Sequence, residues 1–87
     1  MSEKNELEFP LEWYGKLVVY SSTGDITDLI RGIFRRMNLR GAEIEKGNRS
    51  SKGAYQVWNL SAEIPSQIVL DMLFQNLKEV PGVKMVM

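Results

Sequence analysis

The chain has 87 residues, of which 44% are hydrophobic and 25% are charged, as expected for a single globular domain. Eleven basic residues balance eleven acidic ones, so the total charge indicates neither a nucleic-acid nor a membrane partner. Cysteine and histidine are both missing, which excludes disulfides, thiolate chemistry and the usual zinc sites, and removes the commonest general acid–base group. We therefore expect a non-enzymatic protein with no metal and no cofactor.

Residues 1–12 carry four glutamates against one lysine and show no hydrophobic periodicity, which predicts an acidic, partly flexible tail. The folded domain is then expected to span residues 13–87. The polar N-terminus is not typical of a signal peptide, and no apolar run approaches the ~20 residues of a membrane span. We expect a cytoplasmic protein with no membrane partner.

The first predicted strand follows Trp13, because residues 14–20 are rich in β-branched and aromatic side chains. A break at residues 21–24 leads into a helix that Asp25 is expected to cap. Helical spacing predicts one buried stripe on this helix, formed by Ile26, Leu29, Ile30, Ile33, Phe34 and Met37. Gly32, inside that helix, suggests a close approach of another backbone.

Residues 42–46 alternate between apolar and charged side chains, which favours a half-exposed strand at a sheet edge. Residues 54–63 alternate again, so Trp58 is expected to face the helices while Tyr55 and Val57 face away. Pro65 is typical of the first turn of a second helix. The buried side of that helix is predicted to include Val69, Met72, Leu73 and Leu77, widened by Ile68, Leu70 and Phe74. A last strand is expected at residues 83–87.

The order strand, helix, strand, strand, helix, strand predicts an α+β, ferredoxin-like βαββαβ domain. Its four-stranded antiparallel sheet should carry two helices on one face. Ile33, Trp58 and Leu73 should then share one interior.

The turn at Ser50, Ser51, Lys52 and Gly53, followed by Tyr55, has a moderately specific sequence. With the ending at residues 83–87, it resembles the YbeD-like family of small bacterial proteins of unknown function. The resemblance implies a ferredoxin-like fold, similar in outline to ACT-type regulatory domains, and implies no activity. A serine–lysine catalytic pair in this turn would need a desolvated lysine, whereas a hairpin tip is wet. We expect Ser50 and Ser51 to bond nearby backbone and Gly53 to adopt a positive φ.

Two regions are candidates for function. The loop of Thr23, Gly24 and Asp25 could hold a small ligand, as in an ACT-type sensor of amino acids or metabolites, although it lacks the proline that such loops carry. The open sheet face is the other candidate, with Tyr14, Val18, Tyr20, Tyr55 and Val57.

The open face has two alternative interpretations. It could bind a protein partner or a second copy of the chain, or the N-terminal tail could cover it through Phe9 and Trp13. Its tyrosines also allow base stacking, but the aromatic motif of RNA-recognition domains is missing, so we do not expect a nucleic-acid partner. The function that we predict is a small regulatory or adaptor module acting through protein contact, and the alternative is an ACT-like small-molecule sensor.

Overall fold

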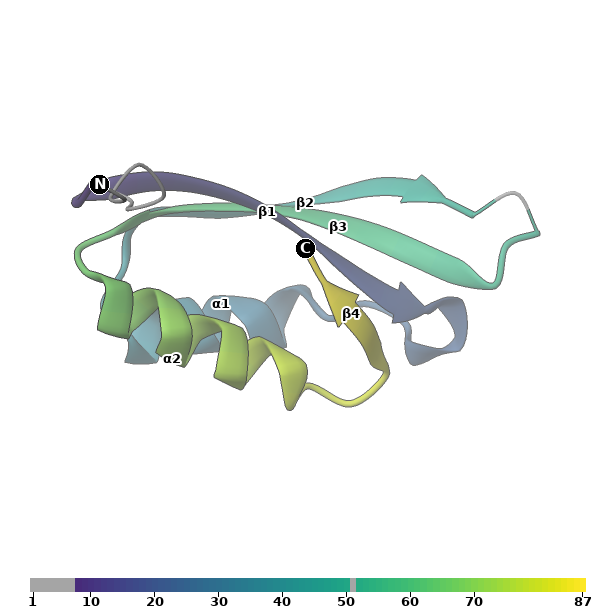
Figure 1. The fold of residues 1–87 in the computed structure, drawn as a ribbon. Helices are drawn as coiled ribbons and strands as arrows, with labels where there is room; N and C mark the ends of the chain where they lie inside the picture. The colour runs from purple at the N-terminus through teal and green to yellow at the C-terminus, as the bar shows by residue number, and fades with distance from the viewer. Residues whose placement is uncertain (1–7, 51) are drawn as a thin grey trace.

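The protein is a two-layer α/β sandwich in the computed structural model, which describes residues 8–50 and 52–87. One antiparallel sheet with the strand order β2-β3-β1-β4 carries two helices on a single face (Figure 1). The strands are β1 (Leu11–Tyr20), β2 (Arg40–Arg49), β3 (Tyr55–Ile64) and β4 (Val83–Val86). The helices are η2 (Ser21–Thr23), a 3₁₀ turn, followed by α1 (Thr27–Arg36) and α2 (Gln67–Lys78). This arrangement confirms the ferredoxin-like α+β fold.

The two central strands, β1 and β3, pair along their whole length, from Leu11 opposite Ile64 to Tyr20 opposite Tyr55. Side chains alternate between the two faces of a strand, so every second residue points to the helices. The first strand begins before the expected domain boundary, because Leu11 and Glu12 already belong to the sheet. Phe9 packs against the core, while residues 1–7 of the predicted tail lie outside the described residues.

A single hydrophobic core fills the space between sheet and helices, and Ile33, Trp58 and Leu73 all belong to it, as predicted. Trp13 points into this core and meets Phe74 of α2 edge to face, with ring centroids 5.7 Å apart. Its ring lies over Gly15, where a side chain would overlap it. The interpretation in which Trp13 covers the open face is therefore wrong.

The helices bury narrower stripes than the sequence predicts. In α1 the stripe is correct except for Leu29, which is 53% exposed because it lies at the margin of the apolar arc. In α2 the buried line is Leu70, Leu73 and Leu77. Ile68 and Met72 each lie two positions from Leu70, so they face the opposite side of the helix and are exposed.

The helix starts also differ from the prediction. Ile26, not Asp25, occupies the cap position of α1, although the Asp25 carboxylate accepts a hydrogen bond of 2.8 Å from the Thr27 N–H. Ser66 caps α2 by accepting from the Val69 N–H at 3.3 Å, so Pro65 precedes the helix. Among the described residues, no backbone of another element lies close to the place that a side chain at position 32 would take, and a β-carbon there would meet only the Arg36 guanidinium, at 3.7 Å.

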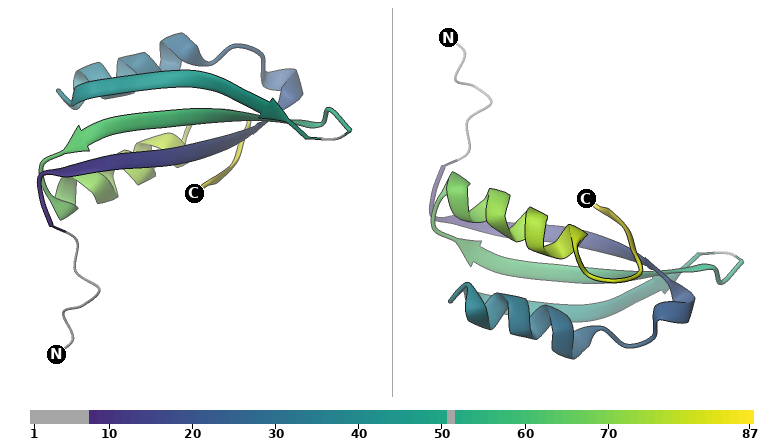
Figure 2. Two further views of the ribbon diagram at one scale, coloured as in Figure 1. Left: turned by 90° about the horizontal axis from the view of Figure 1, so that it is seen from above. Right: turned by 90° about the horizontal axis from the view of Figure 1, so that it is seen from below.

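The two helices do not cover the whole length of the sheet. As predicted, β2 is an edge strand, and α1 runs along its side of the sheet while α2 runs along the β1 side (Figure 2). The β2–β3 hairpin projects beyond both helices (Figure 1). At the hairpin end, the sheet therefore lies next to η2 and the loop before α1, and not next to α1 or α2.

Candidate functional site

The open sheet face holds every aromatic and aliphatic side chain that the sequence assigns to it. Val18 lies directly opposite Val57, and Tyr20 opposite Tyr55. The two tyrosine rings are 5.3 Å apart between centroids and are tilted by 39°. Tyr14, farther along β1, is the most exposed of the group at 73%.

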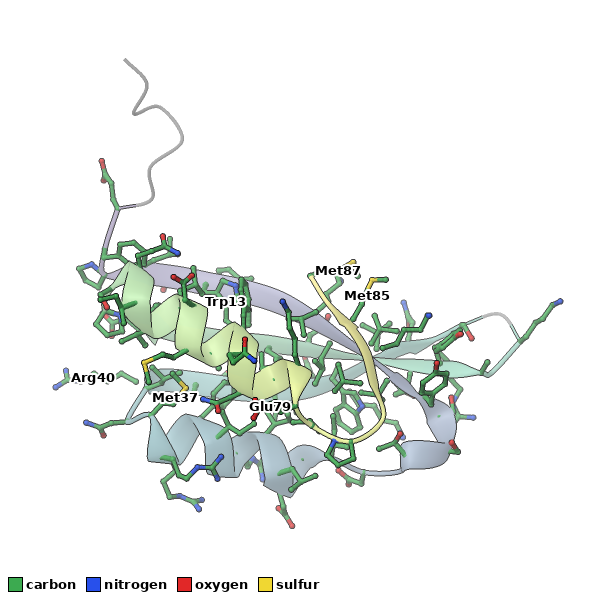
Figure 3. The ribbon with its side chains drawn as sticks, turned by 60° about the horizontal axis from the view of Figure 1, so that its bottom comes forward. Trp13, Met37, Arg40, Glu79, Met85 and Met87 are labelled. Carbon is green, nitrogen blue, oxygen red and sulfur yellow. The ribbon has the colours of Figure 1, made fainter. Side chains whose placement is uncertain are left out.

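The last strand enlarges this face with residues that the sequence analysis missed. Met85 lies opposite Val18, and Met87 exchanges two backbone hydrogen bonds with Lys16, of 3.0 and 2.8 Å. Both methionines are exposed at the C-terminal end of the chain (Figure 3). We call the set the sheet-face patch: Tyr14, Val18, Tyr20, Tyr55, Val57, Met85 and Met87. The alternation Met85-Val86-Met87 was the available signal, but only the register against β1 tells which face these residues take.

Charge and shape vary along the face. A shallow hollow of about 490 Å³ lies between Tyr14 and Met87, floored by the backbone of Gly15 and Leu60 and flanked by Lys16. Beside the aromatic end, the Lys84 ammonium lies 5.7 Å from the centre of the Tyr55 ring, within cation–π range.

The other end of the same face is acidic. Glu12 lies directly opposite Glu63, and Glu43 lies opposite Ser61 on the neighbouring strand. Like charges placed directly across a sheet destabilise it. The open face thus runs from a carboxylate end to an aromatic and methionine end.

The residues of the predicted ligand loop do not converge. The Thr23 side chain packs against Gly82, in the space that a side chain there would need. Gly24 takes a φ of +83°, and the Asp25 carboxylate is engaged by Thr27. Hydrogen bonds from the hydroxyl and then the backbone N–H of Thr27 hold the pKa of Asp25 below its usual value. Gly24 and Asp25, but not Thr23, border a small cavity beneath the loop.

The family-motif turn serves as a hairpin connection. Ser50 Oγ accepts from the Tyr55 N–H at 3.1 Å, and Gly53 has the expected positive φ, +74°. The Gly53 N–H donates to the Ser50 carbonyl oxygen at 2.8 Å. Lys52 is exposed, and Ser51 lies outside the described residues. These contacts match the local backbone role predicted for Ser50 and Gly53.

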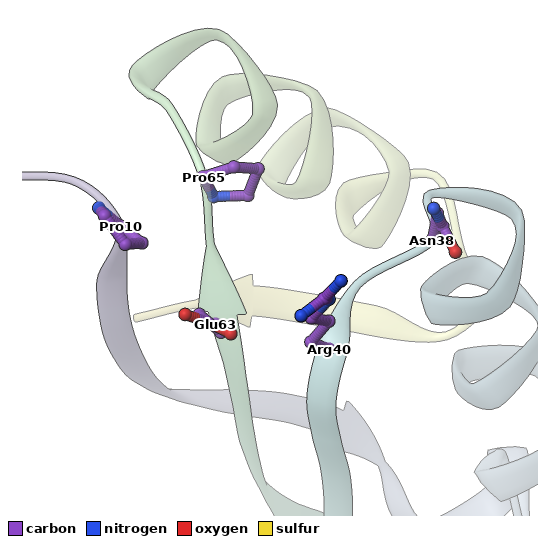
Figure 4. Close-up of a pocket in the computed structure, with 5 residues that line it drawn as sticks. All are labelled: Pro10, Asn38, Arg40, Glu63 and Pro65. Carbon is purple, nitrogen blue, oxygen red and sulfur yellow. The ribbon is translucent and has the colours of Figure 1, made fainter.

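A further hollow, of about 320 Å³, lies where β3 ends (Figure 4). It is lined by Pro10, Asn38, Arg40, Glu63 and Pro65. Arg40 and Glu63 are partners across the β2–β3 ladder, so one positive and one negative group share its rim. It holds no pairing of a nucleophile with a base.

Two features are missing from residues 8–50 and 52–87, the part of the chain that the structure describes. No group of three or more acidic side chains there is arranged to hold a metal ion. No helix there is both long and apolar enough to cross a membrane.

The sheet order and the single helical layer define a small domain with the ferredoxin-like fold, which ACT domains also have. Three solved structures illustrate this. The chain is 16% identical to protein HP0495 from Helicobacter pylori, with a TM-score of 0.76 over 99% of this chain and 90% of that one. It is 18% identical to the ACT domain of GTP pyrophosphokinase from Chlorobium tepidum, with a TM-score of 0.65 over 88% and 97%. It is 14% identical to the C-terminal domain of MgtC from Mycobacterium tuberculosis, with a TM-score of 0.53 over 94% and 89%.

The family follows from the sequence itself. The family model described as "Protein of unknown function (DUF493)" matches residues 4–87, so the chain belongs to that family. This confirms the YbeD-like resemblance. No curated protein matches the chain significantly. The structural similarities, all below 25% identity, show the fold alone.

Proposed function

We propose that this protein is a non-enzymatic regulatory or adaptor module that binds a protein partner through its open sheet face. One observation carries the proposal: the seven residues of the sheet-face patch come from β1, β3 and the C-terminal segment of residues 85–87, and they lie on the face of the sheet that no helix of the described residues covers (Figure 1). Apolar patches that a folded monomer leaves exposed commonly mark interaction sites.

The charge gradient along the face indicates the chemistry of the partner. At one end Glu12 lies opposite Glu63, and the charge of Arg40 on the other side of Glu63 offsets only one of these two carboxylates, so a basic group of the partner would be attracted there. Tyr14 and Met87 flank a hollow that can receive an apolar side chain. A partner surface with a cationic end and an apolar anchor therefore fits best. A second copy of the chain is one candidate, since Lys16 and Lys84 also lie on this face.

The test uses two matched double variants. Tyr14→Thr with Met85→Thr removes two exposed apolar side chains from the sheet face and keeps residues that favour strands. Ile68→Gln with Met72→Gln removes two from the exposed side of α2 and keeps residues that favour helices. Molar mass in solution and capture of partners from extract of the source organism are measured for both variants and for the unchanged chain.

We expect the sheet-face variant to lose self-association or specific capture, while the α2 variant retains it. Equal binding by both variants would contradict the proposal, and so would a chain that stays monomeric and captures nothing.

A second candidate function, small-molecule sensing, is supported by the cavity that Gly24 and Asp25 border. A thermal-shift screen of amino acids, neutral metabolites and anionic metabolites tests it. A ligand present at 100 times its Kd should add about 2.7 kcal/mol to the stability. Absence of any stabilising compound would remove this candidate without affecting the sheet-face proposal.

A further inference from the structure

The cavity beneath the loop before α1 has an unusual lining for this protein. It measures about 120 Å³ and lies between that loop and the helix-facing side of β2 and β3. Ser21, Lys46, Arg49, Gln56 and Trp58 contribute to it, together with the loop residues already described. The rest of the helix-facing side is covered by apolar side chains of the core, so this end is its polar end.

Two buried polar atoms lack a hydrogen-bond partner among the described residues, and both belong to residues of this cavity. They are Ser21 Oγ and Trp58 Nε1. Buried donors and acceptors in folded proteins are nearly always paired, so these two atoms are available to a molecule that enters the cavity. An indole N–H can only donate, so such a molecule must bring an acceptor.

A bulge in β2 brings two cations to the same cavity. Lys46 lies opposite Trp58 and Arg49 opposite Gln56, so three steps along β2 match two along β3. Without the extra residue, positions 46 and 49 would face opposite sides of the strand. The bulge therefore turns both basic side chains toward the helix-facing side.

Gln56 holds this bulge in place. It is 5% exposed, and its amide donates to the carbonyl oxygens of Gly47 at 2.8 Å and Asn48 at 3.4 Å. Its own oxygen accepts from Arg49 Nε at 3.5 Å. Gly47 fits because a side chain there would come within 2.9 Å of Asn59. The cationic part of the cavity is thus braced by a buried side chain.

We propose that this cavity binds a compact oxyanion, the carboxylate or phosphate group of a small molecule. Trp58 Nε1 and Ser21 Oγ donate to its oxygen atoms, and Lys46 and Arg49 balance its charge. Asp25 leaves the lining with one net positive charge, which disfavours a metal cation and favours an anion. This inference rests on the second candidate function, for which it names the ligand class, and is independent of the sheet-face patch.

The two tryptophans allow a direct test by NMR, because the chain has only two indole N–H groups. Trp13 lies in the core against Phe74 and serves as the internal control. Inorganic phosphate and acetate are titrated separately, with sodium chloride at equal ionic strength as the reference. We expect a saturable downfield shift of the Trp58 indole N–H with at least one oxyanion and no comparable change at Trp13. The oxyanion that saturates the shift at the lower concentration shows whether the cavity prefers a phosphate or a carboxylate.

Charge variants complete the test. Lys46→Gln and Arg49→Gln should each weaken binding by about tenfold, because each removes a charge-assisted contact. Asp25→Asn should tighten binding, because it removes a repelling carboxylate. All three positions are exposed, so the variants are expected to fold, which circular dichroism checks.

The inference is overturned if neither oxyanion moves the Trp58 signal saturably, which would mean that water alone fills the cavity. Equal shifts with chloride, or unchanged affinity in both lysine and arginine variants, would also overturn it. A neutral compound could stabilise the unchanged chain and the Lys46→Gln and Arg49→Gln variants equally. That result would support small-molecule sensing but would contradict an oxyanion as the ligand. A screen in which nothing binds would remove both.

Discussion

Gly15 lies at the centre of β1, where the indole of Trp13 occupies the position of its missing side chain. We expect Gly15→Ala to destabilise the fold by about 1–3 kcal/mol, because the added methyl group would displace the ring from its contact with Phe74. Urea denaturation followed by circular dichroism measures this loss.

Gly32→Ala is the matched control, because the space around Gly32 is open and its backbone is helical. It should stabilise the protein by about 1 kcal/mol, the usual difference between the two residues inside a helix. A stabilising Gly15→Ala, or a strongly destabilising Gly32→Ala, would show that the packing described for these two glycines is wrong.

The contribution of Asp25 to the stability of the fold should depend on pH. Its pKa is lowered in the folded protein by Thr27, so the ionised form stabilises the fold above the usual value of 3.8. That contribution is lost as the pH falls through the lower, folded pKa. The unchanged chain should therefore exceed Asp25→Asn in unfolding free energy at about pH 7, with the difference shrinking at about pH 3 and below. Urea denaturation at both pH values measures it, and a difference that grows on acidification would have the wrong sign.

At the scale of single elements, Ser66 decides where α2 begins. Its side chain accepts from the Val69 N–H, one of the backbone donors that a helix start leaves free. Ser66→Ala should cost about 1 kcal/mol of stability. Ser66→Asp, which can also accept this bond and adds a favourable charge at the helix start, should keep the stability. Thermal denaturation compares the stability of the two variants. An equal loss of stability in both would contradict a capping role for Ser66.

The sequence patterns predicted the faces of the central strands more accurately than the buried sides of the helices. Two-residue alternation predicted the faces of β1 and β3 correctly, because a strand with one buried face has only one acceptable register. Helical periodicity predicted α1 and α2 but overestimated their buried arcs at Leu29, Ile68 and Met72. A sequence does not show which apolar residues of a helix will be buried. A helix that lies on a sheet buries only a narrow strip of its own surface.

The candidate sites were less predictable than the elements. Five residues of the sheet-face patch follow from alternation in β1 and β3. Met85 and Met87 do not, because the register of β4 depends on a bulge in its pairing with β1. The cavity beneath the loop was missed because it combines residues from three segments and depends on the extra residue in β2. Sequence spacing gives no sign of such convergence.

At the scale of the whole molecule, one core joins the two ends of the sheet. Trp13 meets α2 near the start of β1, and Trp58 lies near the hairpin end, yet both belong to the same buried cluster. We expect unfolding to be a single cooperative transition. In Trp13→Phe and Trp58→Phe, the fluorescence of the remaining tryptophan should change at the same urea concentration as the circular dichroism. Separate midpoints in either variant would show that the two ends unfold independently.

The contact between Trp13 and Gly15 has one more consequence, for spectroscopy. One of the two Cα hydrogens of Gly15 points at the indole ring of Trp13, whose ring current changes the local magnetic field. Its proton resonance should be displaced from the range of ordinary glycine signals, and it should return to that range when the ring leaves Gly15 as α2 detaches. A single peak would thereby report on the docking of that helix.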